Sequence, residues 1–188
     1  MSENNNQSLG DLFPDLGPEV PIISGGAHDN TESLATVRRV PNEPGMAAKV
    51  FTLLAEAGVN VDMIVQASAS TGTADISFTV PGSAAAKVRD VLQEKQDELG
   101  YQSFDIDANV GKVAVVGVGM KTHSGLAAKF FNALSDEGVN VLMISTSEIR
   151  IAALVPLEQL QDAVRALHTA YGLDAEQVEA VVYGGTGR

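Results

Sequence analysis

The segment 45–51 reads GMAAKVF, and 80 residues further on the segment 125–131 reads GLAAKFF. The match continues without a gap to residues 58–61 and 138–141, which both read GVNV. Across the 20 aligned positions that begin at the two glycines, 12 residues are identical. Self-similarity at a fixed spacing indicates a duplicated structural unit.

Each copy shows the same order of predicted elements, judged from hydrophobic spacing and from glycine and proline breaks. The first copy contains strand 34–40, a helix from 44, strands 59–65 and 73–80, a helix from 82, and strand 102–107. The second contains strand 112–118, helix 124–136, strands 139–146 and 148–155, helix 157–171, and strand 178–183. The βαββαβ order predicts an α+β, ferredoxin-like fold, with antiparallel sheets that each carry their helices on one face.

These elements divide the chain into domains 34–109 and 110–188. Residues 1–20 are polar and are expected to form a flexible leader. Residues 21–33 include the end of an apolar run, Val20–Ser24, which predicts an extra edge strand. The residues alone leave open which sheet takes this strand.

Composition excludes several classes of function. With 12 Lys and Arg against 24 Asp and Glu, the net charge of -12 opposes binding to nucleic acid and to anionic membranes. The absence of cysteine excludes disulfides and thiol chemistry and is compatible with a cytoplasmic protein. No histidine spacing suggests metal ligands, and no carboxylate pair suggests acid–base catalysis. We therefore expect no catalytic residues, no metal and no cofactor.

The loop 41–47, PNEPGMA, feeds directly into the first helix. Backbone N–H groups at such a helix start attract a carboxylate, although a simple capped turn has the same appearance. On the next strand, period-2 alternation would place Asn60, Asp62 and Gln66 on one side. An amino acid is the ligand predicted here, with its carboxylate at the helix start and its ammonium at Asn42, Asp62 or Gln66.

The second copy keeps the loop as residues 121–127, KTHSGLA, but has Leu142 in place of Asp62. The second site has therefore lost one candidate ammonium partner. Two sites that are duplicated but diverged suggest that one loop completes the pocket of the other, within the chain or across a dimer.

Several longer motifs resemble the regulatory half of aspartate kinase. They are PNEPGMAAKVF at 41–51, NVDMI at 60–64, TADISF at 73–78, ISTSEIRI at 144–151 and AVVYGGTGR at 180–188. The run at 144–151 is the most specific, and the resemblance extends from residue 21 to residue 188. It implies two tandem ACT domains. Because that family tends to insert the first domain within the second, it also implies that residues 21–27 pair with the second sheet.

The function implied by this resemblance is regulatory. These residues show no counterpart of the family's kinase domain, so the chain is expected to be a non-catalytic β subunit or an excised regulatory fragment. Its expected partners are a second copy, as a homodimer, and a kinase-bearing α subunit. Its expected effector is threonine, with lysine contributing to feedback inhibition of aspartate-family amino-acid biosynthesis.

The family's effector site carries over by position to residues of both copies. The first-copy residues are Asn42, Glu43, Pro44, Gly45, Met46, Ala47, Asn60, Val61, Asp62 and Gln66. The second-copy residues are Leu126, Ala127, Asn140, Val141, Ser147 and Glu148. Where the family commonly has aspartate, this chain has Asn42, and an amide is a weaker partner for an ammonium group.

Three alternatives remain from the sequence. A free-standing ACT amino-acid sensor that regulates another enzyme would share the same fold. An acylphosphatase-like catalyst would need an arginine-bearing phosphate loop, but Arg38 and Arg39 precede the turn. An RNA-binding module of this topology would need basic charge and aromatic residues on its strands.

Overall fold

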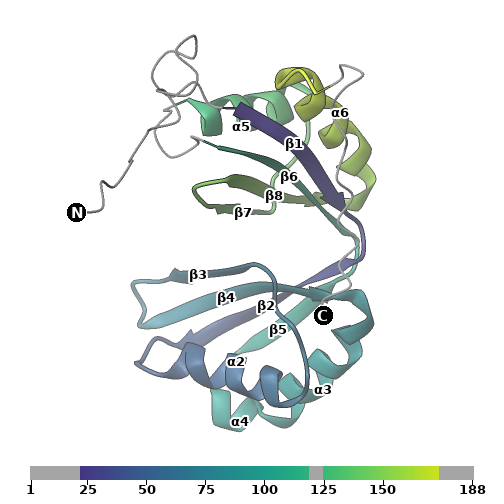
Figure 1. Cartoon of the computed structure of the whole chain (residues 1–188). Helices are drawn as coiled ribbons and strands as arrows, with labels where there is room; N and C mark the ends of the chain where they lie inside the picture. Colours follow the sequence, from purple (N-terminus) through teal and green to yellow (C-terminus); the bar gives the residue numbers. More distant parts are fainter. Residues whose placement is uncertain (1–21, 119–124, 174–188) are drawn as a thin grey trace, which may run out of the picture.

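The computed structural model describes residues 22–118 and 125–173, which form two α+β domains (Figure 1). The first domain contains a four-stranded antiparallel sheet in the order β3-β4-β2-β5. Its strands are β2 (Glu32–Pro41), β3 (Ile64–Ser68), β4 (Thr73–Pro81) and β5 (Ser103–Asp107). Its helices are α2 (Met46–Glu56), the short 3-10 turn η1 (Gly82–Ala84), α3 (Ala85–Glu94) and α4 (Gln96–Leu99), and they cover one face of the sheet.

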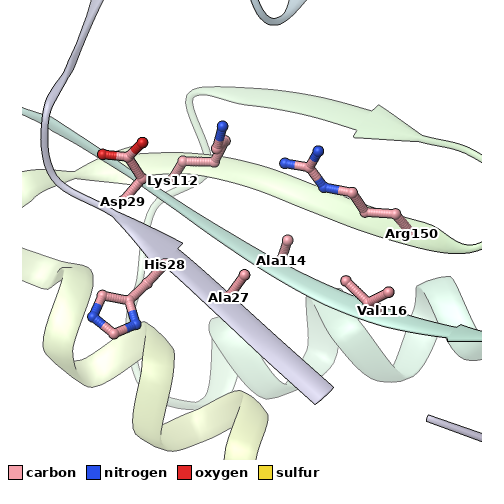
Figure 2. Close-up of a pocket in the computed structure, with 7 residues that line it drawn as sticks. All are labelled: Ala27, His28, Asp29, Lys112, Ala114, Val116 and Arg150. Atoms are coloured by element: carbon pink, nitrogen blue, oxygen red, sulfur yellow. The ribbon is translucent and has the colours of Figure 1, made fainter. Parts of the chain in front are cut away.

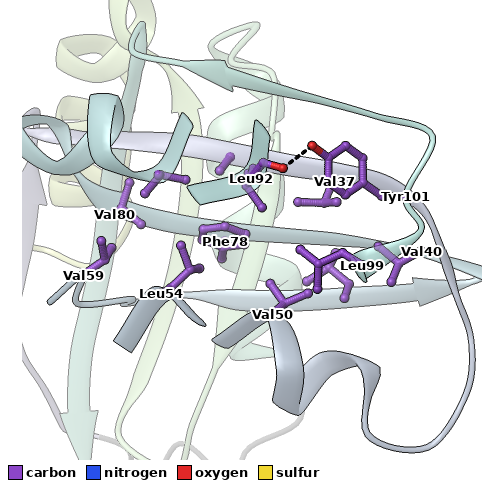
Figure 3. Close-up of a cluster of buried hydrophobic side chains, with 13 residues drawn as sticks. Val37, Val40, Val50, Leu54, Val59, Phe78, Val80, Leu92, Leu99 and Tyr101 are labelled. Carbon is purple, nitrogen blue, oxygen red and sulfur yellow. Dashed lines mark hydrogen bonds between the residues drawn. The ribbon is translucent and has the colours of Figure 1, made fainter. Parts of the chain in front are cut away.

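The core of the first domain follows from the period of 2 along its strands and of 3.6 along its helices. Ile76 and Phe78 alternate along β4 and point to the helices, while Val50 and Leu54 lie one turn apart on α2. All four belong to one buried cluster, in which Phe78 is fully buried, and Figure 3 shows Phe78 together with Val50 and Leu54. Burying a side chain of this size contributes roughly 2–3 kcal/mol, so the cluster holds α2 and α3 on the sheet.

The second domain contains the sheet β1-β6-β8-β7. Its elements are β1 (Ile22–Asp29), β6 (Val110–Val118), α5 (Leu126–Asp136), β7 (Met143–Thr146), β8 (Arg150–Pro156), the 3-10 turn η2 (Leu157–Gln159) and α6 (Leu160–Ala170). Strand β1 precedes the whole first domain in sequence but pairs antiparallel with β6, from Ile22 opposite Val118 to Asp29 opposite Lys112. The predicted strand 178–183 lies outside the described residues.

The element types match the predicted fold class, but two strands begin four or five residues later than predicted. β3 begins at Ile64 and β7 at Met143, whereas the strands were expected from 59 and 139. The physical reason is that Val59 and Val139 still close the preceding helices, by donating to the carbonyls of Leu54 and Leu134 at 2.9 Å. Helix α4 was not predicted, because four residues with one buried leucine carry too little periodic signal.

The two sheets face each other, and the helices lie on the outer sides (Figure 1). Met63 and Met143, which are equivalent positions of the two copies, meet in a buried cluster with Val110 and Leu154, and Leu34 packs against it. This cluster joins the inner faces of the two sheets. None of the helices in the described part of the chain is long and apolar enough to cross a membrane.

Candidate effector-binding site

Backbone hydrogen bonds, one of them to the turn between β3 and β4, hold the loop before α2 in place. The Asn42 N–H donates to the carbonyl of Gly72 at 3.0 Å, and the Glu43 N–H donates to the carbonyl of Pro41 at 3.0 Å. Gly45 then adopts φ 92°, a left-handed conformation that favours glycine, and α2 begins at the next residue. No side chain caps this helix, and its first turn carries no acidic residue. The Met46 N–H donates to the carbonyl of Glu43 at 3.2 Å, and the positive end of the helix dipole can attract an anionic group to the N–H groups that follow in the first turn.

Three polar side chains come together beside this helix start. The Asn42 side-chain amide donates to Ser68 Oγ at 3.3 Å, and Gln66 Nε2 donates to Asn42 Oδ1 at 3.5 Å. Asn42 comes from the loop, and the other two residues lie on the same face of β3. Of the three, Ser68 was not predicted. Its position two residues after Gln66 was the signal that could have revealed it.

The side chains of Asp62 and Gln66 point to different parts of the molecule and have different partners. The Asp62 N–H donates to the carbonyl of Thr79, and the Thr79 N–H donates to the carbonyl of Met63, both at 3.0 Å. Asp62 and Met63 therefore both lie opposite the single residue Thr79. This β-bulge interrupts the alternation that was assumed for residues 60–66. The Asp62 carboxylate accepts a hydrogen bond from Lys112 Nζ, on the inner face of the second sheet.

The same lysine contacts a second carboxylate of the first domain. Lys112 Nζ lies 3.3 Å from Glu32 Oε1, and both side chains are only 12% exposed. Burial and the hydrogen bond with Asp62 outweigh the attraction of Lys112 and raise the pKa of Glu32 to about 7. Burial also acts to raise the pKa of Asp62, but hydrogen bonds from Lys112 and Glu32 and the nearby positive charges lower it overall.

Because the pKa of Glu32 is raised and that of Asp62 is lowered, a proton taken up by these two carboxyl groups resides mainly on Glu32. Glu32 Oε2 is buried and accepts no hydrogen bond from the described residues. When protonated, the Glu32 carboxyl group can donate to the Asp62 carboxylate, which remains ionised beside Lys112. Sequence reasoning missed Lys112 and Glu32, because they are 80 residues apart and no local pattern links them.

The remaining predicted residues of the first copy lie around the loop and the strand that follows α2. Glu43, Pro44 and Asn60 are exposed. Met46, Ala47 and Val61 are half-buried and pack against the core, so their side chains support the loop.

In the second copy, Gly125 has φ 100° and α5 begins uncapped at Leu126, as α2 does at Met46. Residues 119–124 of this loop lie outside the described part of the chain. Leu126 and Val141 pack against the core, and Ala127 is exposed. The Asn140 N–H donates to Gln159 Oε1 at 2.9 Å.

Ser147 and Glu148 follow β7 and are exposed. The Ser147 N–H donates to the carbonyl of Arg150 at 2.8 Å, and Ser147 Oγ accepts from the N–H of Ile149 at 3.4 Å. These two residues therefore lie on a tight turn between β7 and β8, and the structure does not place them among the contacts of Asn42 and Gln66.

Both candidate sites border a sheet edge with exposed apolar side chains. Ile64 on β3 is 52% exposed and Ile144 on β7 is 45% exposed, and β3 and β7 are the edge strands of their sheets. Such edges offer unpaired backbone groups and apolar surface to another chain. The polar group of Asn42, Gln66 and Ser68 is open on this side.

The comparisons with known proteins agree with this architecture. The ACT domain family matches residues 38–96 and 113–171. An aspartokinase of Corynebacterium glutamicum is 44% identical over 176 residues, which are 93% of this chain and 42% of that protein. An aspartokinase of Mycobacterium tuberculosis is 43% identical over 176 residues, with the same coverage. The chain therefore spans less than half of the length of these relatives.

Two solved structures contain chains that are matched over almost their whole length. A chain in a crystal structure of aspartokinase alpha and beta subunits is 42% identical, has a TM-score of 0.76, and is matched over 99% of its length by 80% of this chain. The regulatory subunit of aspartate kinase from Thermus thermophilus is 36% identical with a TM-score of 0.75, over 98% of its length and 79% of this chain.

The duplicated fold and the two family matches define a tandem ACT-domain protein. The chain belongs to the aspartokinase family, as a pair of ACT domains that corresponds to the regulatory region.

Proposed function

We propose that this chain is the non-catalytic regulatory part of an aspartate kinase and that it binds threonine, with lysine contributing to feedback inhibition. The observation that carries the proposal is the meeting of Asn42, Gln66 and Ser68 beside the uncapped start of α2. The match to complete regulatory subunits supports the same assignment. Cytoplasmic localisation, expected from the sequence, and the lack of any cofactor belong to the same proposal.

The chemistry of this site suits a small amino acid. The N–H groups in the first turn of α2 would receive the carboxylate, because the positive end of the helix dipole lies there. The side-chain oxygens of Asn42 and Gln66 would accept from the ammonium group, and Ser68 Oγ would pair with a hydroxyl on the ligand. Asn42 and Gln66 are neutral, so affinity would depend on several partners acting together.

In a single chain this site is open, and we propose that a second copy covers it. Ile64 and Val65, 52% and 38% exposed, lie on the same edge strand as Gln66. A homodimer that pairs these edges would bury the apolar side chains and enclose the bound amino acid. The ligand would then stabilise one arrangement of the two chains.

Regulation would follow from that preference. A kinase-bearing α subunit is the proposed partner, and an aspartokinase structure with alpha and beta subunits is among the similar structures. If the arrangement that binds threonine more tightly also disfavours catalysis, threonine inhibits the kinase by shifting the population toward it. Linkage requires the reverse effect as well, so kinase substrates that favour the active arrangement would weaken threonine binding.

Calorimetric titration of the purified chain with threonine and with lysine tests effector binding. We expect saturable threonine binding that weakens at least about tenfold in Gln66→Ala, because ammonium partners contribute 1–3 kcal/mol each. Gln93→Ala, at an exposed position on α3, is the matched control and should bind as the unaltered chain does. The absence of binding at millimolar concentrations of both amino acids would contradict the effector assignment.

Reconstitution tests the kinase partner. The chain should co-purify with a kinase-bearing subunit and should make its aspartate kinase activity sensitive to threonine. Binding of threonine without any association with that subunit would instead support a free-standing sensor.

A further inference from the structure

A cavity of about 280 Å³ opens on the face of the second sheet that is turned towards the first domain (Figure 2). Strand pairing explains which residues line it. Ala27 on β1 lies opposite Ala114 on β6, Asp29 lies opposite Lys112, and Val116 on β6 lies opposite Arg150 on β8. The side chain of His28 points to the other side of the sheet, as the alternation of a strand requires.

The middle of the cavity is formed by small side chains. Ala27 and Ala114 contribute only methyl groups, so the space above them stays open. Lys112 and Val116 are four residues apart on β6, which places the two ends of the cavity roughly 13 Å from each other. The cavity is thus long enough for a small organic acid that lies along the strands.

Arg150 is the distinctive residue of this cavity. Its side chain is half-buried, and within the described ranges no hydrogen bond or ion pair joins its guanidinium group to another side chain. Its positive charge acts on Asp62, where it helps to lower the pKa, but without direct contact. A partly buried guanidinium group without a bound partner favours a planar oxyanion, which can accept two parallel hydrogen bonds.

The other charged groups at the cavity are engaged with protein partners. Lys112 Nζ is shared between Asp62 and Glu32. Asp29 lines the same end, and its Oδ1 accepts from the backbone N–H and the hydroxyl of Thr31. Because Glu32 has a pKa of about 7, part of the negative charge near Lys112 is neutralised by a proton at neutral pH.

We propose that this cavity binds a small oxyanion, a carboxylate or a phosphate, with Arg150 as its principal partner. The small side chains of Ala27 and Ala114 leave room for the ligand beside the guanidinium group of Arg150. None of the lining residues belongs to the loop 42–47 or to residues 66–68, so this is a second site, independent of the amino-acid site proposed above. A ligand that reaches Lys112 competes with Asp62 and loosens the link between the domains.

Thermal unfolding and isothermal titration of the full chain with inorganic phosphate and with malonate test this proposal, with sodium chloride at matched ionic strength as the reference. Arg150→Gln removes the guanidinium group, and Ala27→Leu fills the cavity without changing any charge. We expect at least one of the two oxyanions to bind, and its affinity to fall at least about tenfold in both variants.

Arg38→Gln is the matched control. It removes an arginine from the first sheet, where Arg38 pairs with Asp105, and it should bind the oxyanion as the unaltered chain does. Binding of phosphate alone or of malonate alone would support the proposal and identify the source of the oxyanion. No response to either, or an equal response in Arg150→Gln and the unaltered chain, would overturn it. A circular dichroism spectrum of each variant verifies folding, and Ala27→Leu keeps the test decisive if Arg150→Gln does not fold.

Discussion

Lys112 of the second domain donates a hydrogen bond to Asp62 of the first, although 50 residues separate them in the chain. The same ammonium group lies 3.3 Å from Glu32 Oε1. With the buried cluster around Met63 and Met143, this contact links the two inner sheet faces. Because Asp62 is paired with Lys112, it does not join the polar group at the α2 loop. That group consists of Asn42, Gln66 and Ser68.

Replacing Lys112 with methionine should destabilise the chain by roughly 1–3 kcal/mol, because it leaves two adjacent carboxyl groups without their cation. Urea unfolding measures the change. Lys87→Met, at an exposed position on α3, is the control and should change stability by less than about 0.5 kcal/mol. Equal stability of the two variants would show that Lys112 does not hold the domains together.

Glu32 should make stability depend on pH. Its pKa is about 7 in the folded chain and 4.5 as the ordinary value, so the folded state binds the proton more tightly. The resulting stabilisation is fully present below pH 4.5 and is lost as the pH rises through 7. Since Glu32→Gln cannot ionise, the stability of this variant relative to the unaltered chain should rise by roughly 1–3 kcal/mol between pH 5 and pH 8. A stability difference that is constant with pH would contradict this account.

Gly111 allows β6 to approach α6 closely. A Cβ atom at this position would lie 2.8 Å from Leu160 Cδ2, inside a buried core. Gly111→Ala should therefore cost about 1–3 kcal/mol of unfolding free energy. The double variant Gly111→Ala with Leu160→Ala should lose less stability than the sum of the two single losses, because the contacts with the two Leu160 Cδ atoms are removed. Strict additivity in urea unfolding would indicate that the two residues do not touch.

The exposed edge strand should support dimerisation. Ile64→Lys places a charge on β3 and should weaken self-association at least about tenfold, as measured by analytical ultracentrifugation. Leu157→Lys, at another exposed apolar position but on the turn before α6, should leave association unchanged. If both variants associate like the unaltered chain, the dimer uses a different surface.

Much of this fold can be predicted from the sequence. The repeat that begins at Gly45 and Gly125 reveals where two helices start, which helix faces are buried and in which order the strands follow. The bulge at Asp62 is not predictable from alternation, because it depends on how Thr79 pairs across the sheet. Asn42 and Gln66 could be predicted to meet from local patterns. The link from Lys112 to Glu32 and Asp62 could not, because it arises only when the two domains pack together.

The most direct test of effector binding is a two-dimensional ¹⁵N NMR titration of the full chain with threonine. We predict that the amide signals of residues 42–47 and 64–68 shift progressively and saturate, while those of α6 stay in place. Shifts confined to other parts of the chain, or no shift at millimolar threonine, would contradict the claim that the α2 loop and β3 form an amino-acid site.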